Sequence, residues 1–158
     1  MRLTLAFFVA VVVALVVACS GGNDDAALER AAIQAMTDLN AADETFPTQF
    51  TKELAGLTGI LIMGTDGAAD TIKVKLLPLI DGYLATIDKA VALADKYMAT
   101  KQDEKTKAGV DAIRKRAEAF HKARERFVEL EQKARAGATA DEINSGIMGI
   151  GLMLSVGK

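Results

Sequence analysis

Residues 80–98, with the sequence IDGYLATIDKAVALADKYM, decide the fold. Apolar side chains recur in this stretch at alternating spacings of four and three residues, at Ile80, Leu84, Ile87, Val91, Ala94 and Met98. Such a heptad pattern is typical of a helix that packs against other helices in a bundle. We therefore predict a long helix from the turn at residues 65–67 to about Ala99, which Pro78 kinks or divides near Leu77.

Similar patterns on both sides of this stretch predict three more helices. A first helix over about 24–42 and a second over about 47–63 are expected to be separated by Thr45-Phe46-Pro47. A fourth helix, over about 102–136, is expected to end at Gly137. The side chains predicted to face the core are Leu28, Ala32, Ala35 and Leu39 in the first helix, Phe50, Leu54, Leu57 and Leu61 in the second, and Val110, Ile113, Ala117, Phe120 and Phe127 in the fourth.

The C-terminal segment differs from the rest because it carries no charge from Ile143 to Gly157. Thr139 and Glu142 form a capping-box pattern that predicts the start of a short helix. About 22 Å of helix, at 1.5 Å per residue, is too short to cross a bilayer. Two alternatives therefore stay open: burial within the bundle, or docking against a membrane or a partner.

The composition supports an all-α fold. The chain has 158 residues, two prolines and no tryptophan, and half of it is apolar. We expect one domain over residues 24–158, an up-and-down helical bundle of four main helices plus a short hydrophobic C-terminal helix.

The N-terminus has the charged start and apolar run of an export signal. Met1-Arg2 precedes a stretch from Leu3 to Ala18 in which only Thr4 is polar, and this stretch ends in Val16-Val17-Ala18-Cys19. That ending resembles the lipobox of bacterial lipoprotein precursors. The resemblance implies that residues 1–18 are a removed signal peptide and that Cys19 becomes the first residue and carries diacylglycerol. The new amino group often carries a further acyl chain such as palmitate. The alternative is an uncleaved membrane helix.

The same resemblance predicts a location and partners. Residues 19–23 would form a flexible tether of at most about 15 Å between the lipid and the bundle. The membrane, reached through the lipid on Cys19, is then the first partner, and an envelope protein is a second. An aspartate directly after the lipidated cysteine would resemble an inner-membrane retention signal. In this chain the residue at that position is Ser20. In a host with two membranes, we therefore expect the outer membrane, with the bundle facing the periplasm.

The sequence lacks the residues that several kinds of catalytic or metal site require. Once Cys19 is lipidated, no thiol remains for a disulfide, a nucleophile or a metal. The single histidine, His121, cannot build a structural zinc site, and no phosphate-binding or serine-hydrolase motif is present. Without residues 1–18 the chain has 18 basic and 21 acidic side chains, and these are interleaved, which argues against nucleic acid or anionic lipid as partners. We therefore expect no catalytic residues, no metal and no cofactor.

A second resemblance rests on two short stretches, Met36-Thr37-Asp38-Leu39-Asn40 and Ala119-Phe120-His121-Lys122-Ala123-Arg124. They are similar to parts of the periplasmic four-helix b-type cytochromes. This resemblance implies that Met36 and His121 are the axial ligands of a haem and that the protein carries electrons or stores haem. From the residues alone, Met36 could equally be a core side chain, and His121 could lie on the flank of its helix, beside the inward-facing side chains.

The functional prediction is therefore a lipid-anchored helical bundle of the cell envelope, with a structural or protein-interaction role and no catalysis. The alternative is ligand carriage, of haem or of a small apolar molecule. The side chains considered for an apolar ligand, which also suit simple core packing, are Phe50, Ile60, Met63, Phe120, Phe127 and Met148.

Overall fold

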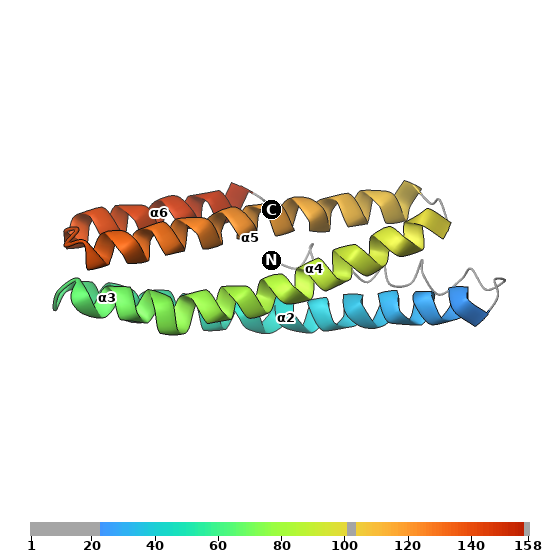
Figure 1. The fold of residues 1–158 in the computed structure, drawn as a ribbon, viewed down its shortest axis with the longest axis horizontal. Helices are drawn as coiled ribbons and strands as arrows, with labels where there is room; N and C mark the ends of the chain where they lie inside the picture. The colour runs from blue at the N-terminus through green and yellow to red at the C-terminus, as the bar shows by residue number, and fades with distance from the viewer. Residues whose placement is uncertain (1–22, 101–103, 157–158) are drawn as a thin grey trace. The chain divides into compact units, whose positions relative to one another are not determined.

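The computed structural model describes residues 23–100 and 104–156 of the chain, and this part is all-α (Figure 1). No strand occurs among these residues, and the all-α prediction is confirmed. The elements are α2 (Asn23–Leu61), α3 (Asp66–Thr71), the π-helical turn η1 (Ile72–Leu76), α4 (Leu77–Thr100), α5 (Glu104–Arg135) and α6 (Ala140–Val156). In the described ranges, no helix combines the length and the apolar character needed to cross a membrane.

The predicted break at Thr45-Phe46-Pro47 is wrong, because α2 continues through Pro47. Proline in a helix interior removes one backbone hydrogen bond and costs about 3 kcal/mol. Packing of the neighbouring aromatic side chains offsets this cost. Phe46 and Phe50 are both buried, and the Phe46 ring stacks on Tyr83 with the ring centroids 4.1 Å apart. Two predicted helices are therefore one.

The prediction for Pro78 is confirmed, since the π-helical turn η1 separates the α-helical segments α3 and α4, and α4 begins at Leu77. Pro78 has no N–H with which to reach the carbonyl of Val74 in an α-helix. The chain widens into η1 just before it, and the Leu77 N–H reaches five residues back to the Ile72 carbonyl. A single wide turn of this kind keeps the helix going where the α-helical hydrogen bond is lost.

The predicted core positions are largely correct. In the heptad stretch Ile80, Leu84, Ile87 and Ala94 are buried, whereas Val91 and Met98 are partly exposed. The inward positions predicted for the other helices are buried except for three half-buried side chains, Leu28, Leu54 and Phe120.

The chain forms two compact units that share α2, α4 and α5. The described part of the first unit comprises residues 23–43, 85–100 and 104–115. Its core is rich in alanine, which lets helices approach closely, and contains Ala32, Ala35, Met36, Leu39, Ile87, Ala90, Ala94, Tyr97, Val110 and Ile113. Surface ion pairs join its helices, Asp38 with Lys89 at 3.4 Å and Asp95 with Arg114 at 2.6 Å.

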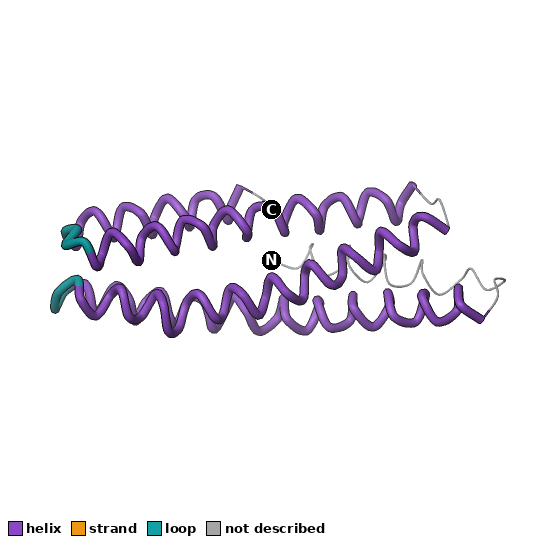
Figure 2. The backbone as a smooth tube through the Cα atoms, viewed as in Figure 1, coloured by secondary structure: helices purple, strands orange, loops and turns teal. Residues whose placement is uncertain are grey.

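The described part of the second unit comprises residues 44–84 and 116–156 and has the larger side chains in its core. Its two described loops, residues 62–65 and 136–139, lie at the same end of the unit (Figure 2). Gly137 has a φ of 87°, and the N–H of Ala138 reaches the Lys133 carbonyl at 3.0 Å. This Schellman geometry confirms Gly137 as the end of the helix.

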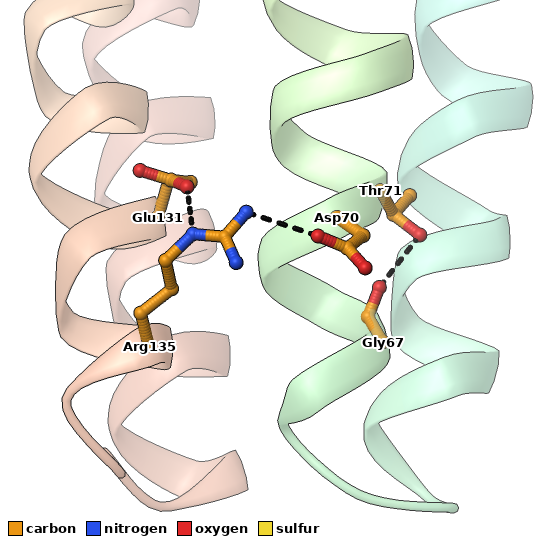
Figure 3. Close-up of polar contacts among 5 residues, drawn as sticks. All are labelled: Gly67, Asp70, Thr71, Glu131 and Arg135. Atoms are coloured by element: carbon orange, nitrogen blue, oxygen red, sulfur yellow. Dashed lines mark hydrogen bonds and ion pairs between the residues drawn. The ribbon is translucent and has the colours of Figure 1, made fainter.

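Polar contacts link α3 to α5 in this unit (Figure 3). The Arg135 guanidinium donates to Glu131 on its own helix and to Asp70 on α3, the latter at 2.9 Å. Both carboxylates favour the charged guanidinium, and the hydrogen bond to Glu131 is the main cause that raises the pKa of Arg135. A second ion pair joins Asp81 to Arg124 at 2.5 Å. Asp81 lies eleven residues after Asp70, and Arg124 lies eleven residues before Arg135. The positions of the two pairs match an antiparallel arrangement of these helices.

The capping box of α6 is confirmed. The Thr139 N–H donates to a Glu142 carboxylate oxygen at 2.8 Å, and the Glu142 N–H donates to the Thr139 hydroxyl at 3.3 Å. Beyond this cap, α6 is buried on one face only. Ile143 and Ile150 are buried, whereas Met148 is 68% and Leu152 is 67% exposed. Burial within the bundle therefore describes one face of this segment only, and docking of the other face against a membrane or a partner stays a prediction.

Candidate functional site

The predicted lipidation residue, Cys19, lies outside the described residues. The same is true of the predicted signal peptide, residues 1–18, and of the predicted tether except Asn23, at which α2 begins.

The two predicted haem ligands lie in different units. Met36 is buried in the first unit, where it belongs to the core. His121 is exposed on α5 in the second unit. The structure therefore supplies no geometry for a shared haem iron, and this ligation stays a prediction from the cytochrome resemblance alone.

The residues considered for an apolar ligand have different surroundings. Phe50 and Phe127 pack edge to face, with the ring centroids 6.0 Å apart. Phe120 packs edge-on against Phe46 and Tyr83, at centroid distances of 5.4 and 4.8 Å. These rings contact one another as core side chains do.

The other members of that set do not join the aromatic rings in one site. Ile60 is half-buried, whereas Met63 is 87% exposed and Met148 is 68% exposed. None of the six lines either of the two grooves described next.

A shallow groove of about 270 Å³ runs between α5 and α6 in the second unit. We call it the α5–α6 groove. Its lining combines apolar side chains, glycines and charged groups, namely Leu130, Ile150, Met153, Gly146, Gly149, Arg126, Glu129 and Lys133. Leu130 and Ile150 are buried and form its floor, and the exposed Arg126, Glu129 and Lys133 of α5 form its rim.

The two glycines of the groove have different roles in its shape. A Cβ atom on Gly146 would lie 2.6 Å from Leu130 Cδ1, so the Leu130 side chain would have to shift to admit it. A Cβ atom on Gly149 would meet nothing within 4 Å. Gly146 therefore packs closely against Leu130, and Gly149 keeps the groove open.

The rim of the groove has an excess of one positive charge. Arg126 Nη1 donates to Glu129 at 2.8 Å, and both side chains remain more than half exposed. Lys133 lies seven residues from Arg126, about two turns along the same face of α5. Its charge also contributes to the lowered pKa of Glu142, for which the hydrogen bond from the Thr139 backbone is the main cause.

An apolar surface adjoins the groove. We define the outer face of α6 as Ser145, Met148, Gly149 and Leu152, which are all exposed and follow helical spacing. Gly149 belongs to both features. The sequence analysis identified the lack of charge in this segment but did not predict the groove, because the rim of the groove comes from α5, where acidic and basic residues are interleaved.

A second groove, of about 500 Å³, lies in the first unit between α4 and α5. It is lined by Asp95, Met98, Glu104, Lys107, Val110, Asp111 and Arg114. The Arg114 guanidinium donates to both Asp95 and Asp111, and the charge of Asp95 is the main cause that raises the pKa of Arg114. The central charges are thus compensated within the groove itself.

Within residues 23–100 and 104–156, no group of three or more histidine, cysteine, aspartate or glutamate side chains is placed to hold a metal ion. Comparison of the chain with known protein families, curated proteins and solved structures found no match.

Proposed function

We propose that this protein is a lipid-anchored component of the bacterial cell envelope. Its helical bundle would have a structural or protein-interaction role and no catalysis. Val16-Val17-Ala18-Cys19, placed directly after a charged start and an apolar run, is the observation that carries this proposal. Two or three acyl chains bind a protein to a membrane far more strongly than one, since each buried methylene contributes about 0.8 kcal/mol.

The composition of the bundle favours an interaction role over catalysis. The chain has a single histidine, and its only cysteine would carry the lipid. In the second unit, the described side chains of Ile62, Met63, Val74, Met148 and Leu152 are large, apolar and exposed. Of these, Met148 and Leu152 lie one turn apart on α6, and neighbouring exposed apolar side chains are typical of contact surfaces.

Removal of the cysteine tests the anchor. We expect wild-type protein to incorporate labelled palmitate in a lipoprotein-processing bacterium and to fractionate with membranes. Cys19→Ser should incorporate none, because serine provides no thiol for the diacylglyceryl thioether. The matched control is Ser20→Ala, which changes the next residue and should label as the wild type does. Palmitate incorporation by Cys19→Ser would refute the proposal.

Ser20 tests the location in a host with two membranes. We propose that the wild-type protein resides in the outer membrane and faces the periplasm. Ser20→Asp should move it to the inner-membrane fraction, since aspartate at this position resembles a retention signal. Separation of the two membranes on a density gradient measures this shift, and an unchanged distribution would argue against the proposed location.

A further inference from the structure

We propose that the outer face of α6 and the adjoining α5–α6 groove rest on an anionic lipid surface, with lipid phosphates at Arg126 and Lys133. The inference deepens the proposed function and rests on it, because the anchor at Cys19 would keep the bundle at a membrane.

The apolar part of the contact comes from α6. Met148 and Leu152 lie one turn apart and are 68% and 67% exposed. The outer face of α6 contains no charged residue, and none occurs in the sequence between Ile143 and Val156. A helix that is packed on one side and apolar on the other is suited to lie in the plane of a membrane interface.

The charged part of the contact comes from α5. Arg126 and Lys133 are exposed at the rim of the groove, and Glu129, bound to Arg126, is the only acidic residue that lines it. Basic side chains next to an apolar surface attract lipid phosphates, and their aliphatic stems can cover apolar groups while the charge stays in water. Acidic side chains outnumber basic ones over the whole sequence, but the rim of the groove is a local exception, with two basic side chains and one acidic one. This local charge complements an anionic lipid surface.

The same charge argues against a second copy of the chain as the occupant. A twofold contact through the outer face of α6 would bring two basic rims into one interface. Like charges placed together in this way disfavour association. A lipid surface meets both the apolar side chains and the basic rim without this repulsion.

An anchor also makes a weak contact sufficient. Tethering converts the contact between α6 and the membrane into an intramolecular event with a high effective concentration. Two apolar side chains and two basic ones, too few to hold a soluble protein at a membrane, can then orient an anchored one.

The absence of tryptophan allows a direct test with the full-length lipidated protein. Leu152→Trp places a single reporter on the outer face of α6. Val74→Trp is its matched control, since Val74 is 68% exposed but lies on η1. Each variant is reconstituted in vesicles of phosphatidylethanolamine and phosphatidylglycerol with brominated acyl chains. We expect Leu152→Trp to lose about half of its emission and Val74→Trp to lose almost none. Equal quenching of the two would overturn the inference.

The basic rim is tested in the same system. Arg126→Gln with Lys133→Gln, combined with Leu152→Trp, should reduce quenching to the level of the Val74→Trp control. Vesicles of phosphatidylcholine alone should have the same effect on Leu152→Trp itself. If neither the two Gln substitutions nor the change to phosphatidylcholine reduces quenching, the assignment of lipid phosphates to this rim is overturned. A blue-shifted but unquenched emission would indicate that protein, such as a second copy, covers the face.

Flotation and N-terminal mass analysis separate this inference from the proposed function. Proteins that carry no lipid and do not float with the vesicles would refute the anchor. In proteins that carry the lipid and float with the vesicles, equal quenching of Leu152→Trp and Val74→Trp would refute the α6 contact and leave the anchor standing.

Discussion

Glu142 shows how one side chain secures the start of a helix. Its carboxylate accepts hydrogen bonds from the backbone and the hydroxyl of Thr139, and these contacts lower its pKa from the ordinary value of 4.5. A carboxyl group with a lower pKa in the folded state stabilises the fold when it is ionised. This contribution is present above about pH 4.5 and is lost as the pH falls through the lower, folded-state pKa.

Glu142→Gln should therefore weaken the acid dependence of stability. The amide can still accept a hydrogen bond from Thr139 but does not titrate. We expect the thermal midpoint of the wild type, followed by circular dichroism, to fall more steeply between pH 5 and pH 3 than that of the variant. Identical slopes would show that the cap does not contribute to acid sensitivity.

Phe127 is the largest fully buried side chain of the second unit, with no measurable exposure. Phe127→Ala should lower the free energy of unfolding by about 3–5 kcal/mol, because it removes apolar contacts and leaves a cavity. Urea denaturation measures the change. Lys122→Ala, at an exposed position on the same helix, is the control and should change stability by less than about 0.5 kcal/mol. A loss below about 1 kcal/mol at Phe127 would contradict the packing described for this core.

Among the elements, α2 differs most from the sequence-based expectation, because it continues through Pro47. Pro47 and the preceding Phe46 are local signals for a break, but tertiary packing of Phe46 against Tyr83 outweighs them. The division at Pro78 was predictable because the missing hydrogen bond acts locally. The π-helical turn η1 at this position was not predictable, since sequence alone does not show whether a helix widens, kinks or ends before a proline.

Pro47→Ala tests the continuity of α2. Alanine restores the backbone hydrogen bond and has the highest helix propensity, but it also gives the unfolded chain more freedom. Since Pro47 is exposed, no packing is lost. We expect a net gain of about 1–2 kcal/mol in the free energy of unfolding. A net loss in urea denaturation would indicate that α2 is broken at this position.

The spacing between α5 and α6 is tested by a matched pair of glycine substitutions. Gly149→Ala meets open space and should stabilise α6 by about 0.5–1 kcal/mol through helix propensity. Gly146→Ala makes the same chemical change but places its Cβ against Leu130, so overpacking should cancel that gain. In denaturation experiments, Gly149→Ala should therefore be more stable than Gly146→Ala by about 0.5–1 kcal/mol. Equal stabilities would contradict the close approach at Gly146.

At the scale of the whole chain, charge is distributed by helix. α2 has seven acidic and two basic side chains, whereas α5 has six acidic and ten basic ones. The segment between α2 and α5 forms ion pairs with both helices. Its Lys75 and Lys89 pair with acidic residues of α2, and its Asp70, Asp81 and Asp95 pair with arginines of α5. Exposed pairs contribute little stability each, but complementary charge favours this choice of neighbours over others.

The helical class, the inward positions and the end of α5 at Gly137 were predictable, because they depend on local periodicity and turn chemistry. The α5–α6 groove was not, since Arg126 and Lys133 meet Gly149 only through tertiary packing. The lipid anchor is a different kind of prediction. It depends on recognition of Cys19 and the residues before it by processing enzymes, rather than on the fold.

The N-terminus of the protein isolated from bacterial membranes is therefore the most direct test of the account. Mass spectrometry of the N-terminal peptide should find a chain that begins at Cys19 and carries a diacylglyceryl group, with or without a further acyl chain on the amino group. A peptide that begins at Met1 with an unmodified Cys19 would show that the chain is neither cleaved nor lipidated at this site.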